Sequence, residues 1–468
     1  MKSKIICLVT CLVLISSVFI VNAIDVRKTN RVHQHLSNTK TVKTDDVEEF
    51  NTHLPIVSID TNGQEIPKEA GLNSTIKSNV KIYDTAENRN NYLTDSPAIE
   101  TLSNIKIKGT TSRDFAKKNY LLKFINADGT KNNQAVMGMA EHNEWVLHGP
   151  FLDKTLIRNY MWYNIGAEIM GYAPNVRFCE VFLNNKYIGL YVMADNITVG
   201  KGRINITEAS DNDVACSYIV RLDRGNLDPN KNLNNFGKYA KRINSRLTMD
   251  IIYPGINDKN IKLKEYIEKD FSKFEKALYS YDYKEYDKYI DVDSFVDYFI
   301  INEFTQNYDA GNLSTYIYKD IRGKLNLCMW DYNSACDNYI SQEVSNMDFD
   351  FQNNVWYIML LRDPEFTDKI INRYRELRKS YLNEEYLLNY IDETVEYLGD
   401  AKDRNFEVWG YTFLPENDLL PEEKKIGSYE EAIEQLKTFI INRGRWLDEH
   451  IEEIKQFSHE STTKKFNH

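Results

Sequence analysis

The chain has 468 residues, with 58 Lys and Arg against 69 Asp and Glu, which gives a formal net charge of −11. Hydrophobic residues make up 42% and aromatic residues 12%, a globular composition that excludes disordered, collagen-like and disulfide-scaffold proteins. The negative charge disfavours a nucleic-acid partner, because proteins that bind phosphate backbones normally display excess Lys and Arg. The length allows two or three lobes with sizeable cores.

The N-terminus has the pattern of a secretory signal peptide. Lys2 and Lys4 precede an apolar run, and Ala23 ends a small-residue cleavage site. The sequence predicts a signal peptide over 1–23 and a secreted mature protein without a membrane span. An uncleaved anchor is the alternative, because the apolar run reaches the lower limit for crossing a bilayer. Residues 24–50 are polar and lack periodicity, which predicts a flexible leader.

The region 51–200 has the alternation of apolar and polar residues that is typical of half-buried strands. Such segments are LPIVSID, SNVKIYD, NIKIKG and KKNYLLKF, and the last two flank a small polar loop, GTTSR, at 109–113. A helical period over 153–170, behind a plausible N-cap at Asp153, predicts one helix against this sheet. VRFCEVFL and YIGLYVM then predict a hairpin.

The region 201–456 is expected to be mainly helical after a strand at 216–222, and the polar tail 457–468 is expected to fray. Its helices are interrupted by residues 307–333, which predict a β-hairpin with Gly323 at the turn. The mature chain has four cysteines without metal-binding spacing, so a zinc site is not expected, while disulfides and free buried thiols both stay open. These are Cys179, Cys216, Cys328 and Cys336.

Phosphoryl transfer requires a loop that phosphates can approach, a cation that binds them, and carboxylates that orient the attacking hydroxyl and hold Mg²⁺. The loop candidate is 109–113, and the carboxylates are Asp309 and Asp331, which the hairpin carries at its two ends. Among the lysines of KKNYLLKF, period two places Lys118 on the face of Tyr120. Lys118 is therefore the candidate inward ammonium, although a lysine that snorkels at a strand end is the alternative.

The spacing of the hairpin is similar to that of protein kinases. There a catalytic Asp is followed five residues later by a metal-binding Asn, and a short hairpin leads to a metal-binding Asp. Here Asp309 is followed by Ser314 and, after the hairpin, by Asp331. Spacing alone leaves open that both aspartates only cap turns.

Five segments, in this order, resemble the CotH family of spore-coat-type protein kinases. They are KGTTSRDFAKKNYLLKF, EWVLHGPFLDKTLIRN, VFLNNKYIGLYVMADNI, TQNYDAGNLSTYIYKD and LCMWDYNSACDN. The resemblance runs from about residue 54 to about residue 455. It implies an α+β, atypical protein-kinase-like fold with a β-rich N-terminal lobe and a mainly helical C-terminal lobe. It also implies a kinase that uses ATP with Mg²⁺ or Mn²⁺ to phosphorylate serine, or threonine, in proteins of a cell surface or spore coat.

The resemblance also assigns roles to individual residues. Asp309 is similar to the catalytic aspartate, Asp331 to the metal-binding aspartate and Trp330 to an adenine-stacking aromatic. Lys118 is the expected phosphate lysine, and Arg113 is a further expected phosphate contact. For Arg158, in the LIRN motif, the expected role is to support the structure or the site.

Two positions depart from the pattern expected for a kinase. Ser314 stands where a metal-binding Asn is expected, and Asn333 stands where a second acid is expected. Both can bind Mg²⁺ as weaker ligands, because they lack negative charge. The alternatives to an active kinase are therefore a non-catalytic relative or structural coat protein, and a glycan-directed exoprotein that uses paired carboxylates. For a kinase, the acidic chain favours a basic, serine-rich protein substrate.

Overall fold

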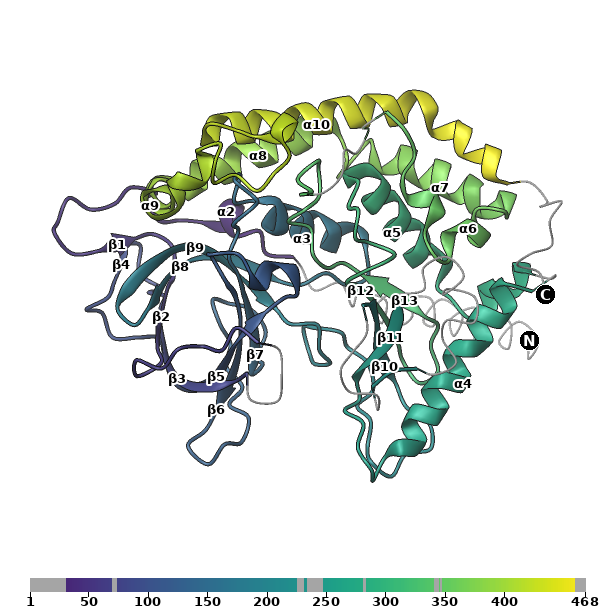
Figure 1. Cartoon of the computed structure of the whole chain (residues 1–468), viewed down its shortest axis with the longest axis horizontal. Helices are drawn as coiled ribbons and strands as arrows, with labels where there is room; N and C mark the ends of the chain where they lie inside the picture. Colours follow the sequence, from purple (N-terminus) through teal and green to yellow (C-terminus); the bar gives the residue numbers. More distant parts are fainter. Residues whose placement is uncertain are drawn as a thin grey trace, which may run out of the picture.

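The computed structural model describes residues 31–69, 74–224, 231–233, 247–280, 283–340, 345 and 347–458. The signal peptide predicted at 1–23, the start of the leader and the tail from residue 459 lie outside these residues. In the described part, a β-barrel is followed along the chain by a smaller sheet and by most of the helices (Figure 1). The expected α+β architecture, β-rich first and mainly helical afterwards, is confirmed.

Among the described residues, seven strands close the barrel in the order β2-β3-β5-β6-β7-β9-β8. Neighbouring strands are antiparallel except for the pair of β2 and β8, which closes the barrel in parallel. The bounds are β2 (Ile56–Asp60), β3 (Ile76–Tyr83), β5 (Ile99–Lys108), β6 (Asn119–Ile125), β7 (Glu144–His148), β8 (Val176–Leu183) and β9 (Lys186–Asp195). Two short strands, β1 (Asn51–Thr52) and β4 (Asn91–Tyr92), pair beside the barrel.

The alternation in the sequence decides which side chains fill the barrel. On β5, Ile105 and Ile107 belong to the core inside the barrel. Lys106 and Lys108 therefore lie on the opposite face of the same strand, because successive side chains of a strand point to opposite faces. This outer face of β5 forms part of the candidate site.

The second sheet is antiparallel, with the order β11-β10-β12-β13. Its strands are β10 (Tyr218–Asp223), β11 (Thr248–Tyr253), β12 (Thr315–Lys319) and β13 (Asn326–Cys328). The predicted hairpin around Gly323 is confirmed as β12 and β13, with Asp309 before its first strand and Asp331 after its second. The four cysteines of the predicted mature chain lie in the described part, where each is buried and free. Of the two alternatives, free buried thiols therefore agree with the structure.

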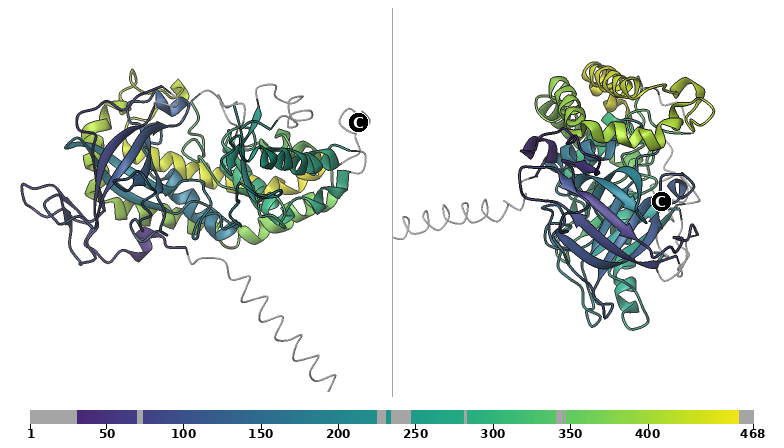
Figure 2. Two further views of the ribbon diagram at one scale, coloured as in Figure 1. Left: turned by 90° about the horizontal axis from the view of Figure 1, so that it is seen from below. Right: turned by 90° about the vertical axis from the view of Figure 1, so that its left-hand side faces the viewer.

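The helices lie between and above the two sheets. They are α2 (Gln34–Ser37), α3 (Arg158–Ile169), α4 (Ile261–Leu278), α5 (Val292–Thr305), α6 (Tyr357–Leu360), α7 (Pro364–Leu377), α8 (Glu384–Leu398), α9 (Asp400–Trp409) and α10 (Tyr429–His450). In Figure 1, α3 lies next to the barrel, α8 and α10 run above it, and α4 lies beyond the second sheet. Figure 2 shows the C-terminal helices, in yellow-green, extending over the barrel, which lies at one end of the molecule. None of the helices in the described ranges is long and apolar enough to cross a bilayer.

Helix α3 begins at Arg158 and not at the expected cap, Asp153. The Asp153 carboxylate nevertheless accepts a hydrogen bond from the Arg158 backbone N–H at 2.9 Å, so it caps the helix from further upstream. The apolar face of α3 belongs to the same core as the second sheet and the C-terminal helices. This core joins the outer face of the barrel to the second sheet and the helices, while the barrel interior is a separate core.

The first part of residues 31–50 contacts the body of the protein, whereas most residues from 41 to 48 are exposed. The sequence predicts a flexible leader over 24–50. Within residues 31–50, the ring of His33 lies within hydrogen-bond distance of the Tyr390 hydroxyl of α8, at 3.0 Å. His35 is buried, and its Nδ1 lies 2.8 Å from the Tyr160 hydroxyl of α3. This segment therefore joins two helices that are far apart in the sequence.

The buried histidine of this segment predicts that acid destabilises the fold. Burial, with a smaller effect of the nearby His33, lowers the pKa of His35 to about 4. Between pH 6.5 and 4 the unfolded chain binds a proton that the folded chain does not, so stability falls as the pH falls. At pH 5 the expected loss from His35 is about 2 kcal/mol relative to pH 7. Urea unfolding at both pH values measures it.

His35→Phe should shrink the difference in unfolding free energy between pH 7 and pH 5 by that amount. His450→Phe is the matched control, because His450 is half-buried at the end of α10, where its ring stacks on Trp446. Equal pH dependence of His35→Phe and the parent protein would contradict the prediction.

Candidate functional site

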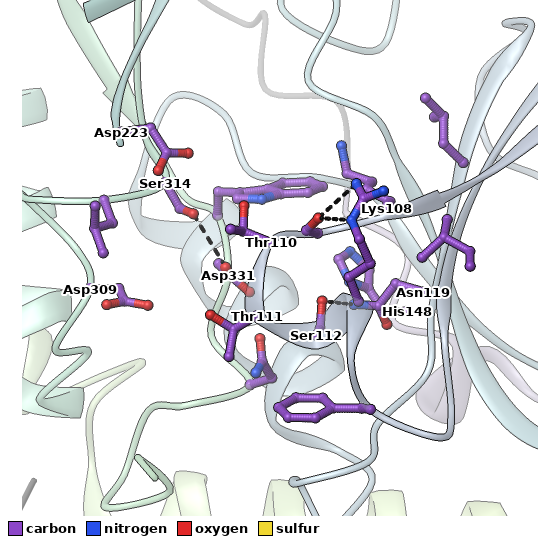
Figure 3. Close-up of a pocket in the computed structure, with 18 of the residues that line it drawn as sticks. Lys108, Thr110, Thr111, Ser112, Asn119, His148, Asp223, Asp309, Ser314 and Asp331 are labelled. Atoms are coloured by element: carbon purple, nitrogen blue, oxygen red, sulfur yellow. Dashed lines mark hydrogen bonds between the residues drawn. The ribbon is translucent and has the colours of Figure 1, made fainter. Parts of the chain in front are cut away.

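A cavity of about 1370 Å³ lies between the barrel and the second sheet (Figure 3). One wall consists of the outer faces of β5, β6 and β7 and of the loop 109–113, and the other of β10 and the two segments that flank the β12-β13 hairpin. Its charged lining residues are Lys106, Lys108, Arg113, Lys123, Arg221, Asp223, Arg224, Lys231, Asp309 and Asp331. The expected loop and both expected aspartates therefore line one cavity.

Helix α3 holds the backbone around Asp331. The Asp331 N–H donates a hydrogen bond to the Tyr163 hydroxyl at 2.9 Å, and the Tyr332 N–H donates one to the Asn159 side chain at 2.8 Å. Asp331 itself has a φ of 67°, in the left-handed region that a residue with a side chain rarely adopts. A constrained backbone of this kind is typical of functional sites, and here it orients the carboxylate that lines the cavity.

Arg158 and Gly166 of α3 both contact the segment that follows β13. Arg158 is 1% exposed, pairs with Asp153 at 2.6 Å and donates to the Ala335 carbonyl at 2.9 Å. At Gly166, a Cβ atom would lie 1.6 Å from the sulfur of Met329, so any larger residue would displace the Met329 side chain that packs on α3 directly after β13. Arg158 thus takes the supporting position expected of it.

Asp309 and Asp331 are carboxylates in a poorly solvated environment. Burial raises the pKa of Asp331 to about 6, and the negative charge of Asp309 adds to this shift. Burial also raises the pKa of Asp309, whose carboxylate accepts a hydrogen bond from the Tyr339 hydroxyl at 3.3 Å. A desolvated pair of carboxylates disfavours its own ionisation and favours a nearby cation or proton donor.

Ser314 lies next to Asp331, as the kinase-like spacing predicts. Its hydroxyl donates to Asp331 at 3.3 Å, and its own φ is 48°. Asn333 also lines the cavity, but its amide donates to the Ser334 hydroxyl at 3.2 Å. Within the described ranges, no three His, Cys, Asp or Glu side chains converge as a metal centre. Mg²⁺ does not need such a cage, because it commonly binds one or two carboxylates together with phosphates and water.

Asp223 is an acidic residue of the site that the sequence analysis missed. It ends β10, lines the cavity and pairs with Arg221 at 3.3 Å. Its negative charge contributes to the raised pKa values of Asp309 and Asp331, which places it near both carboxylates. The only signal in the sequence is its position at the end of a predicted strand.

Lys118 does not point into the cavity, contrary to the expectation. Its Nζ donates to the Arg113 carbonyl at 2.8 Å, and it is absent from the cavity lining. The buried lysine is Lys117, which is 1% exposed and donates to the Leu190 carbonyl at 2.7 Å. Strand β6 begins only at Asn119, so the period of two does not extend to either lysine.

The lysine that does line the cavity is Lys108. Its Nζ donates to the Asn196 side chain at 3.1 Å and lies 5.1 Å from the centre of the Trp330 ring. Burial lowers its pKa to about 8, while the charge of Asp331 acts in the opposite direction. The alternation in NIKIKG could have indicated it, because it separates this lysine from the inward-facing isoleucines.

Arg113 lines the cavity, and its guanidinium closes the loop 109–113. It donates to the Gly109 carbonyl at 3.1 and 3.0 Å and to the Lys68 carbonyl at 2.8 Å. Gly109 has a φ of 109°, and a Cβ atom there would lie 2.0 Å from the Ser112 hydroxyl. The loop is thus compact, and its small side chains leave its backbone open to a ligand in the cavity.

Trp330 lines the cavity but is only 7% exposed. Its indole stacks on Tyr163, with ring centres 6.0 Å apart, and the ring of His148 lies 5.3 Å away. Together with the Lys108 ammonium, these neighbours cover most of the ring. The position agrees with a nucleotide site, but little of the indole is open for stacking an adenine.

The cavity combines the parts that phosphoryl transfer requires. Lys108 and the small-residue loop lie on the barrel side, and Asp309 and Asp331 lie on the opposite side (Figure 3). The profile of the CotH kinase protein family matches residues 105–447, from within β5 to within α10. A comparison with curated proteins finds no match. This family implies a kinase-like fold and the use of ATP.

The environment of Lys108 predicts an unusual titration. Its ammonium should lose its proton near pH 8, because burial disfavours the charge. In Asp331→Asn the midpoint should fall further, because a neighbouring negative charge is removed. Reductive ¹³C-methylation of the lysines followed by NMR titration measures both values, and Lys108→Arg identifies the resonance. A midpoint at the value of the exposed lysines would contradict the prediction.

Proposed function

Because the chain belongs to the CotH kinase protein family, we propose that it transfers the γ-phosphate of ATP to serine, or threonine, of surface or coat proteins. The observation that carries this proposal is the cavity in which Lys108 lies opposite Asp309 and Asp331. An exported protein follows from the signal-peptide pattern at 1–23, and the same pattern supports the surface or spore coat as its location.

In this proposal ATP lies between the barrel and the hairpin, with its phosphates near Lys108 and the loop 109–113. Lys108 takes the role of the phosphate lysine that was first expected of Lys118, because its ammonium lines the cavity. Arg113 contributes by shaping the loop, since its guanidinium is engaged by backbone carbonyls. A cation beside the phosphates stabilises the charge that moves during transfer.

A divalent cation fits the donor set on the other side. Asp331 with the Ser314 hydroxyl would hold Mg²⁺ or Mn²⁺, and the phosphates would complete its coordination. The ion supplies neutralisation of phosphate charge when bound. The negative charges of Asp223 and Asp309 around Asp331 support this placement, because a cation relieves their repulsion.

Asp309 acts on the acceptor. Its carboxylate orients the serine hydroxyl and accepts its proton, while the serine Oγ forms a bond to the γ-phosphorus and the bond from phosphorus to the bridging oxygen of ADP breaks. Its raised pKa makes it a better base than an exposed carboxylate. The hydrogen bond from Tyr339 holds one oxygen of the carboxylate in place.

For the acceptor we retain a basic, serine-rich protein. The support is the net charge of −11 and the three aspartates that line the cavity. Seven Lys and Arg residues line the same cavity, so the preference requires that the basic residues of the acceptor lie close to Asp309 and away from these cations.

A second candidate is a relative that binds ATP without transferring phosphate. Ser314 and Asn333 favour it, because both replace stronger metal ligands at the positions that complete a kinase metal site. This candidate retains the role of Lys108 and removes the role of Asp309 as a base.

Asp309→Asn should abolish most phosphate transfer while ATP still binds. The loss of the proton acceptor should lower the rate on the order of 10²-fold or more, and the affinity for ATP should change by less than about 3-fold. Transfer from γ-labelled ATP with Mg²⁺ or Mn²⁺ measures the rate, and calorimetry measures binding. Asp258→Asn is the matched control, since Asp258 is exposed and does not line the cavity.

The outcomes separate the candidates. Transfer by the parent protein and by Asp258→Asn, with loss in Asp309→Asn, supports an active kinase. ATP binding without transfer by the parent would favour the non-catalytic relative. The absence of both would contradict both candidates and leave the glycan-directed alternative.

The acceptor preference predicts faster phosphorylation of basic serine peptides. A serine flanked by Lys and Arg should react with a higher kcat/KM than the same peptide with Glu at those positions, and the ratio should shrink as the salt concentration rises. Steady-state assays with matched peptides at two salt concentrations measure this ratio. Equal rates on the two peptides would exclude the preference.

A further inference from the structure

His148 lies at the end of β7, on the face of that strand that looks away from the barrel core. Trp145 and Leu147 of the same strand belong to the core inside the barrel. The period of two therefore places His148 on the outer face, and it lines the large cavity. Figure 3 shows it beside Lys108 and Asn119. The proposed function has not yet used this side chain.

The imidazole of His148 carries a buried nitrogen without a partner. The residue is 7% exposed, and its Nε2 has no hydrogen-bond partner. Buried polar atoms in proteins nearly always have a partner, and each exception calls for an explanation. This nitrogen has almost no accessible surface, so a ligand in the cavity can supply the missing partner only when the imidazole turns toward the cavity.

The residues around His148 indicate which kind of ligand would bind there. His148 shares a second, small cavity of about 20 Å³ with Ser112 and Asn119, and all three residues also line the large cavity. Ser112 belongs to the loop 109–113, and Asn119 donates a hydrogen bond to its hydroxyl at 3.1 Å. His148 therefore lies on the side of the loop and of Lys108, where an anion is favoured.

The imidazole is neutral in this position. Burial, with a smaller effect of the positive charge of Lys108, lowers the pKa of His148 to about 3. A neutral imidazole has one N–H donor and one acceptor nitrogen, so it can donate a hydrogen bond to a phosphate oxygen at any pH above about 5. Lys108, in contrast, loses its charge near pH 8.

We propose that His148 is a nucleotide-binding residue whose Nε2–H donates a hydrogen bond to a phosphate oxygen of ATP. The inference rests on the proposed function, because it requires that ATP binds in the large cavity. In this proposal the phosphates of ATP bind to the neutral His148 of β7 as well as to the charged Lys108 of β5.

The test compares the binding of three ligands to the full-length protein. Calorimetry with ATP, ADP and adenosine, each with Mg²⁺ at fixed concentration, is performed on the parent, His148→Phe and His148→Gln. His148→Phe should bind ATP and ADP about 3- to 10-fold more weakly, as expected for the loss of one hydrogen bond. Its affinity for adenosine should be unchanged. His148→Gln, which retains a donor, should recover most of the affinity for ATP.

The pattern across ligands distinguishes the proposal from a structural role. An equal loss for adenosine would assign His148 to the base or to packing and would overturn the proposal. Unchanged ATP binding by His148→Phe, in a parent that binds ATP, would overturn this inference alone. A parent that does not bind ATP would overturn the proposed function as well.

A second measurement covers the case in which the variants do not fold. In the parent labelled with ¹⁵N-histidine, addition of ADP should shift the Nε2 resonance of His148, and the imidazole should remain neutral from pH 6 to pH 8. Assignment uses the loss of that signal in His148→Gln, or, if this variant is unfolded, the coupling of the ring to its own backbone. A Nε2 resonance that ADP does not move would overturn the proposal.

Discussion

Hydrogen bonds between α3 and the segment after β13 hold the candidate site in place. Tyr163 and Asn159 accept hydrogen bonds from the backbone of residues 331 and 332, and Arg158 donates to the carbonyl of residue 335. Arg158 and Asp153 form a buried ion pair, and breaking such a pair from one side leaves an unpaired buried charge. The polar face of one helix thus fixes the carboxylate of Asp331 relative to the barrel.

With Asp331 fixed, the cavity holds the desolvated Lys108 on the barrel side and the desolvated Asp309 and Asp331 on the other side, where Arg221 and Arg224 also lie. Burial lowers the pKa of Lys108 and raises those of Asp309 and Asp331, so burial opposes the charged form of all three groups. A polyphosphate beside Lys108 and a cation beside Asp331 would each favour the charged form. The groups that would stabilise the charges of bound ligands are therefore already in position before the ligands bind.

The departures from a kinase-like pattern lie around Asp331. Ser314 and Asn333 stand where stronger metal ligands are expected, while Asp223, from the end of β10, adds a carboxylate that lies elsewhere in the sequence. On the barrel side of the cavity, His148 lies beside Lys108 and the loop 109–113. The sheet of β10 to β13 and the barrel thus each contribute a residue that the linear spacing of the hairpin does not predict.

Alternation and motif order, which are local properties of the chain, already predict six of the seven barrel strands, the hairpin that carries Asp309 and Asp331, and the family, whereas they do not predict β7 (Glu144–His148) as a strand. Only the tertiary structure decided that Lys108 and not Lys118 lines the cavity, since packing sets the direction of a side chain beyond a strand end. It also placed residues 33–35 against α3 and α8, through the contacts of His33 with Tyr390 and of His35 with Tyr160. Contacts between residues so distant in sequence leave no periodic signal, because they arise only when separate elements pack together.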